Sequence, residues 1–80
     1  MSIHELDTVV LECDVPAHGL RRGDLGAVVH VYGDDAVEVE FVRLSGQTQA
    51  VVQLAVADVR AVRDADLPAV RTAEDRRGAA

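Results

Sequence analysis

The chain is poor in aromatic residues, lysine and cysteine, and each shortage excludes a class of function. Its 80 residues include one tyrosine, one phenylalanine and no tryptophan. Two aromatic side chains cannot line a polyproline groove or build a methyl-lysine cage. They also offer little surface on which the bases of single-stranded nucleic acid stack. The single cysteine, Cys13, excludes an internal disulfide.

The charge balance is acidic. Eight basic residues, all of them arginine, stand against fourteen acidic residues, which gives a formal net charge of −6. Such a protein repels the phosphate backbone, so we expect no nucleic-acid partner. The sequence also shows no apolar run of membrane-spanning length and no signal peptide. We therefore expect no membrane association and a cytoplasmic location.

Short segments rich in β-branched residues predict an all-β fold. A chain of this length allows one domain with a small core. The strand-like segments cover residues 8–13, 26–32, 36–42, 48–54 and 60–62, and residues 56–59 suit a 3₁₀ turn. They predict a small five-stranded SH3-like barrel over residues 1–63. Residues 64–80 are predicted to be a C-terminal tail, partly helical if Pro68 begins a helical turn.

The segment 36–42 has the cleanest alternation of apolar and polar residues in the chain. Its inward side chains are predicted to be Val37, Val39 and Phe41, and its outward ones Glu38 and Glu40. Pairing His30 with Glu38, and Val31 with Val37, leaves a three-residue loop between this strand and the one before it. Three residues are a common hairpin length, so this register is the expected one.

This register predicts an exposed face that suits protein binding. The side chains placed on it are Val28, His30, Tyr32, Glu38 and Glu40. Tyrosine and histidine are amphipathic, and valine adds apolar area, which favours contact with another protein. The alternative is that His30 and Glu38 form a stabilising cross-strand pair with no binding role.

The loop at residues 17–24 contains Arg21 and Arg22, the adjacent basic pair of the barrel portion. One interpretation is that they dock an acidic partner. Gly23 and Gly26 stand between a loop and a strand, so they lack the strand-to-helix context of a nucleotide-binding motif. The structural interpretation is that these glycines permit a tight backbone while Asp24 bonds nearby amides.

No residue pattern predicts catalysis. The three histidines and Cys13 lack the short paired spacings of a zinc site. A nucleophilic cysteine needs a base and an oxyanion hole, and nothing in the sequence marks either. Cys13 is interpreted as a small apolar side chain of a strand. We expect a protein that is not an enzyme and that holds no cofactor and no metal.

Three motifs occur in a characteristic order: LDTVVL at residues 6–11, PxHGLxxGDxGxVV at 16–29 and EVEF at 38–41. Together they resemble a family of small bacterial proteins classed as a domain of unknown function. The resemblance covers about residues 6–62, implies an SH3-like fold and supplies no catalytic residues. Residues 23–29 are more weakly similar to KOW domains and to the barrel of nitrile hydratase β subunits.

Three functions stay open on these observations. The leading hypothesis is a non-catalytic interaction module that docks on a single protein partner, such as an enzyme subunit or a toxin that it neutralises. The second is an accessory subunit that contributes the loop at 17–24, with His18 or Arg21, to a partner enzyme's active site. The third is a homo-oligomeric structural protein that associates through exposed strand edges.

Overall fold

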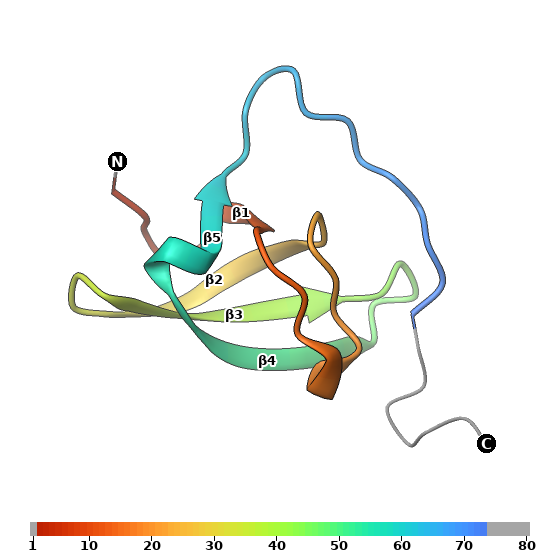
Figure 1. Ribbon diagram of the computed structural model, residues 1–80, viewed down its shortest axis with the longest axis horizontal. Coiled ribbons are helices and arrows are strands. Elements are labelled where there is room, and N and C mark those ends of the chain that lie inside the picture. Colours follow the sequence, from red (N-terminus) through yellow and green to blue (C-terminus); the bar gives the residue numbers. More distant parts are fainter. Residues whose placement is uncertain (1, 74–80) are drawn as a thin grey trace.

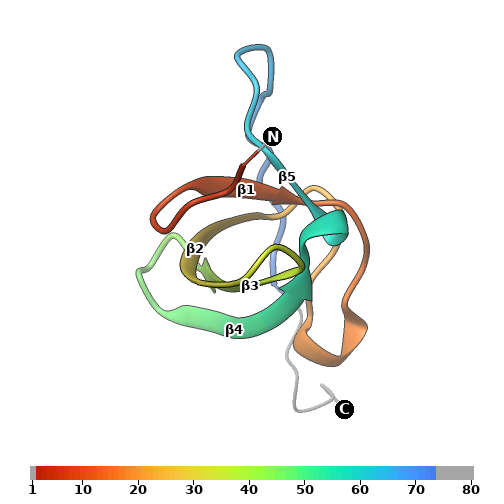
Figure 2. The same ribbon diagram turned by 90° about the vertical axis from the view of Figure 1, so that its left-hand side faces the viewer.

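The computed structural model describes residues 2–73, which form one five-stranded antiparallel sheet. The strands are β1 (Thr8–Leu11), β2 (Leu25–Tyr32), β3 (Ala36–Val42), β4 (Thr48–Ala55) and β5 (Val59–Ala61). The sheet order is β4-β3-β2-β1-β5. Two 3₁₀ turns, η1 (Pro16–His18) and η2 (Val56–Asp58), complete the elements. The sheet curls on itself and η2 joins its two edge strands (Figures 1 and 2), so the predicted all-β SH3-like barrel is confirmed.

The core lies inside the curled sheet and consists almost entirely of aliphatic side chains. Every strand contributes, and the alternation predicted for β3 is the one observed. The buried core side chains are Val9, Leu11, Leu20, Val28, Val37, Val39, Phe41, Ala50, Val52, Leu54 and Val59. The interior of the curled sheet is therefore a packed core that side chains fill.

The β2–β3 ladder confirms the predicted register at its hairpin end and departs from it at a bulge. His30 pairs with Glu38, as expected. Between Val28 and His30 the register shifts, so Val29 is an extra residue in β2. The prediction that Val28 is exposed is therefore wrong. Val28 is 0% exposed, packed in the core opposite Val39, whereas Val29 is 40% exposed.

A second irregularity turns Gln49 inward. Phe41 pairs with Ala50 and Val42 pairs with Thr48, so Gln49 is the extra residue of β4. Alternation along the predicted strand 48–54 places Gln49 outward, on the same face as Gln53. That prediction is wrong, because Gln49 is 7% exposed. The inward amide is satisfied by hydrogen bonds on both sides, which makes its burial tolerable.

Beyond β5 the described chain, residues 62–73, contains neither helix nor strand. The tail leaves β5, arches away from the barrel and returns beside the β3–β4 hairpin (Figure 1). The helical turn predicted after Pro68 does not form up to Ala73, and the rest of the predicted tail lies outside the described residues. Asp66 fixes the start of the arch, since both its carboxylate oxygens accept hydrogen bonds from Arg60 at 2.9 Å.

Candidate functional site

Three of the predicted site residues form a cluster on the outer side of β2 and β3. The rings of His30 and Tyr32 meet edge to face, with their centroids 4.4 Å apart and an interplanar angle of 67°. The Tyr32 hydroxyl donates a hydrogen bond of 3.2 Å to Oε1 of Glu38. Tyr32 is nevertheless 41% exposed. The cluster of His30, Tyr32 and Glu38, called the outer cluster below, is thus both ordered and accessible.

Negative charge surrounds the outer cluster. Reduced hydration raises the pKa of the Tyr32 hydroxyl, and the charge of Glu38 and its hydrogen bond raise that pKa further. Oε2 of Glu5 lies 3.8 Å from Nδ1 of His30. Glu40, two residues along β3, accepts a hydrogen bond of 2.6 Å from the Thr48 hydroxyl. The face therefore combines an aromatic surface with three carboxylates.

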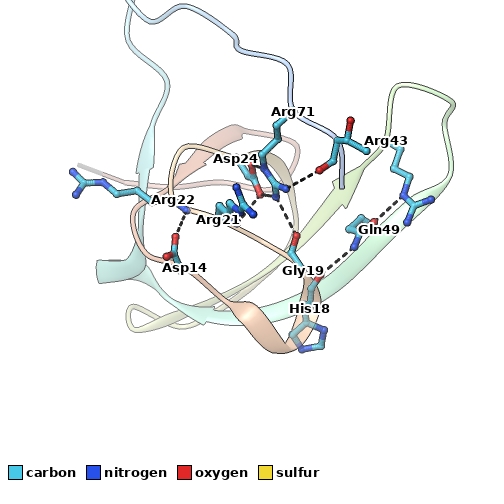
Figure 3. Close-up of polar contacts among 10 residues, drawn as sticks. Asp14, His18, Gly19, Arg21, Arg22, Asp24, Arg43, Gln49 and Arg71 are labelled. Carbon is cyan, nitrogen blue, oxygen red and sulfur yellow. Dashed lines mark hydrogen bonds and ion pairs between the residues drawn. The ribbon is translucent and has the colours of Figure 1, made fainter. Parts of the chain in front are cut away.

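Arg21 and Arg22 lie in the loop before β2, where their backbone amides are structural. The N–H of Arg21 donates to Oδ2 of Asp24 at 2.8 Å, and the N–H of Arg22 donates to Oδ1 of Asp14 at 2.8 Å. The prediction that Asp24 bonds nearby amides is confirmed. Both arginines are exposed, and the Arg22 side chain points away from Asp24 (Figure 3). They precede β2, whereas the outer cluster lies at the other end of that strand, where it pairs with β3 next to the hairpin.

A second cluster, which no sequence pattern indicated, joins Arg71 of the tail to this loop. Arg71 donates from Nε to Oδ1 of Asp24 at 2.9 Å and from Nη2 to Oδ2. Nη2 also donates to the Gly19 carbonyl oxygen at 3.0 Å (Figure 3). Burial alone would raise the pKa of the Asp24 carboxyl. The hydrogen bonds and positive charges of Arg71 and Arg21 outweigh it and hold that pKa below its ordinary value.

A groove of about 470 Å³ runs beside this ion pair. One wall comes from the loop before β2 and the start of that strand, and the other from the end of β3 and the hairpin after it. Tail residues 68–73 form the third side. The apolar side chains that line the barrel walls are Leu20, Leu25, Phe41, Val42 and Leu44. Arg71 is therefore the polar end of a segment that lies along an apolar groove.

Burial and nearby carboxylates affect the remaining candidate nucleophile, Cys13. Cys13 packs against the core. Burial raises the pKa of its thiol, and the carboxylates of Asp58 and Asp14 raise it further, so the nucleophilic thiolate is disfavoured at neutral pH. In residues 2–73, no three histidine, cysteine or acidic side chains gather as metal ligands would. None of the described helical turns has the length and apolar character needed to cross a bilayer.

The molecule is thus a small SH3-like β-barrel with two ordered polar clusters at its surface. Residues 5–61 match the family model described as Domain of unknown function (DUF4926). The chain belongs to this family, and the resemblance noted in its sequence motifs is confirmed. No curated protein and no solved structure matches the chain significantly. The family match ends where β5 ends, so Arg71 lies outside it.

Proposed function

We propose that this protein is a non-catalytic interaction module that docks on a single protein partner through the outer face of β2 and β3. The observation that carries the proposal is the outer cluster of His30, Tyr32 and Glu38. An exposed tyrosine that is already fixed by a hydrogen bond and a ring contact loses little conformational entropy on binding. Tyrosine is also among the residues that most often dominate binding energy at protein interfaces.

The surroundings of the outer cluster support a partner of particular chemistry. Glu5, Glu38 and Glu40 give the face negative charge, while Val29 and Val51 add apolar area that is exposed. A complementary surface would carry basic residues around an apolar centre. The free Cys13 suits a reducing compartment, so a cytoplasmic location is part of the proposal.

Affinity purification of the tagged protein from its own cells, with quantitative mass spectrometry, is the first test. A double variant, His30→Ala with Tyr32→Ala, removes the outer cluster and leaves the core unchanged. Val62→Ala is the matched control, since it truncates an exposed apolar residue at the far end of the chain's barrel portion. We expect one stoichiometric partner with the parent and the control, and its loss with the double variant.

The interaction is then measured with the purified partner by calorimetry. Loss of a tyrosine at the centre of an interface weakens binding about tenfold or more. Tyr32→Phe separates the contribution of the ring from that of the hydroxyl. Retention of the partner by the double variant at unchanged affinity would contradict the proposed face. Absence of any partner from the parent purification would contradict the module itself.

A further inference from the structure

The contact between Arg71 and the loop before β2 has the geometry of a guanidinium receptor. Three acceptor atoms converge on one side chain: both carboxylate oxygens of Asp24 and the carbonyl oxygen of Gly19. The parallel hydrogen bonds to a carboxylate match the planar fork of arginine, which lysine cannot reproduce. The receptor therefore selects arginine by shape as well as by charge.

The barrel builds this receptor without help from the tail. Asp24 is oriented by the N–H of Arg21 at 2.8 Å, and its own carbonyl accepts from the N–H of Leu11 at 2.9 Å. The turn that presents the Gly19 carbonyl is closed by the paired backbone bonds of Val15 and Leu20. Because these contacts come from β1 and its loop, the acceptors keep their places when the guanidinium leaves.

The tail segment that forms the third side of the groove is attached to the barrel through Arg71. Within residues 2–73, the hydrogen bonds between segment 67–73 and the barrel come from the guanidinium of Arg71. Leu67 and Val70 project into solvent, 90% and 88% exposed. Residues 67–73 belong to no strand or helix. Among residues 2–73 the segment is thus held to the barrel by the Arg71 side chain, and a ligand that adds apolar contacts in the groove would displace it.

We propose that this groove binds an extended segment of a partner protein in which an arginine stands among small residues. In the structure the guanidinium of Arg71 occupies the place of that arginine, and such a partner displaces it. The negative charge of Asp24 supplies the complementarity, and Leu25, Phe41 and Val42 supply the apolar floor for neighbouring side chains. The site lies at the opposite end of the β2–β3 ladder from the outer cluster, and it does not depend on the function proposed for that cluster.

The tail competes with an external segment for the groove, and the size of this effect can be calculated. A tethered segment acts at an effective concentration of ~1 mM. If the segment alone binds with a dissociation constant of ~0.1 mM, the tail weakens an identical external ligand about tenfold. Removing Arg71 should therefore strengthen binding of the external segment by about this factor.

The test uses the full-length protein and a fluorescein-labelled peptide with the sequence of residues 67–73, followed by fluorescence anisotropy. We expect saturable binding to the Arg71→Ala variant and about tenfold weaker binding to the unmodified chain. The same peptide with citrulline in place of arginine keeps the shape of the side chain but loses its charge. We expect it to bind Arg71→Ala about tenfold more weakly than the arginine peptide does. The double variant Asp24→Asn with Arg71→Ala should lose binding to a similar extent.

Several results would overturn the proposal. The first is that the peptide shows no saturable binding to Arg71→Ala. The second is that it binds this variant and the unmodified chain equally well. The third is that the citrulline peptide binds Arg71→Ala as tightly as the arginine peptide does. The citrulline comparison uses one protein throughout, so it stays decisive if Asp24→Asn disturbs folding. A dimer of the unmodified chain in sedimentation, absent from Arg71→Ala, would assign the groove to the tail of a second copy and overturn its assignment to a foreign segment.

Discussion

Substitution of Gly26 by alanine tests the packing of the barrel where the glycine-rich motif enters β2. A Cβ at this position would lie 2.5 Å from Cγ1 of Val39, 2.9 Å from Cε1 of Phe41 and 3.1 Å from the carbonyl oxygen of Glu40. Val39 and Phe41 are both buried, so neither has free space to retreat into. Glycine is required here by the closeness of β3.

The expected magnitude follows from two opposing effects. Overpacking a filled core costs about 1–3 kcal/mol. Alanine returns about 0.5–1 kcal/mol, because glycine loses more backbone entropy on folding. The difference between the middles of these two ranges is about 1 kcal/mol, and we expect Gly26→Ala to lower the free energy of unfolding by about this amount. In a domain of this size each kcal/mol moves the melting temperature by about 4–8 °C.

Thermal and urea unfolding, followed by circular dichroism, measure this loss. The decisive control is the same substitution in a Val39→Ala background, which removes the Cγ1 atom that the new Cβ meets. There Gly26→Ala should cost distinctly less than in the parent, since the two side chains compete for one space. An unchanged or raised melting temperature, or an equal cost in both backgrounds, would refute the packing argument.

Three further predictions rest on ionisable groups. Tyr32 is the single tyrosine, so ultraviolet absorbance follows its ionisation alone. We expect its pKa to exceed the ordinary value, and we expect Glu38→Gln to lower that pKa. An unchanged pKa in Glu38→Gln would contradict the contact between the two side chains. The raised pKa of Cys13 should make its alkylation by iodoacetamide at neutral pH slower in the folded protein than in urea, and equal rates would exclude the protected thiol. Arg60 holds the pKa of Asp66 at about 2, below its unfolded value, so this contribution to stability is present above about pH 4 and is lost as the pH falls toward 2. Asp66→Asn should flatten the pH dependence of unfolding in that interval, and an unaltered pH profile would show that the ion pair contributes nothing.

The strands and the pairing of β2 with β3 were largely predictable, because a period of two persists wherever a strand has one buried face. In β3 the alternation of Val37, Glu38 and Val39 is uninterrupted, so the burial pattern and the pairing with β2 at the hairpin were both predicted correctly. The 3₁₀ turn at η2 was also expected, since a short mixed segment had to connect two strands.

The two bulges were not predictable by the same reasoning. Val28 and Val29 are identical in chemistry, so the sequence cannot indicate which of them faces the core. A residue inserted into a strand exchanges the inward and outward positions of all residues on one side of it. The side of Val28 was therefore predicted wrongly, whereas that of His30, on the hairpin side of the bulge, was predicted correctly. Gln49 was misplaced for a related reason, because its inward turn depends on partners in other segments.

The contact of Asp24 with Arg71 joins positions 47 residues apart, and no local pattern predicts such a pair. The sequence predicted that Asp24 accepts hydrogen bonds from amides of its own turn, and that role is confirmed. Arg71 lies in a segment without periodicity, so its partner depends on where the tail returns to the barrel. The charge of Arg71 does not indicate this contact, because other arginines of the chain have similar neighbours in the sequence.

The shortage of aromatic residues also shapes how both proposed surfaces would recognise a partner. Phe41 is buried and Tyr32 is held by Glu38, so neither surface offers the stacked aromatic rows on which proline-rich ligands depend. Recognition at the groove rests instead on Asp24 and a backbone carbonyl, and at the outer face on a tyrosine framed by carboxylates. Attraction between exposed charges is screened within about 10 Å at 0.1 M salt. Because Asp24 is more enclosed than the carboxylates of the outer face, binding in the groove should resist added salt better than binding at the outer cluster.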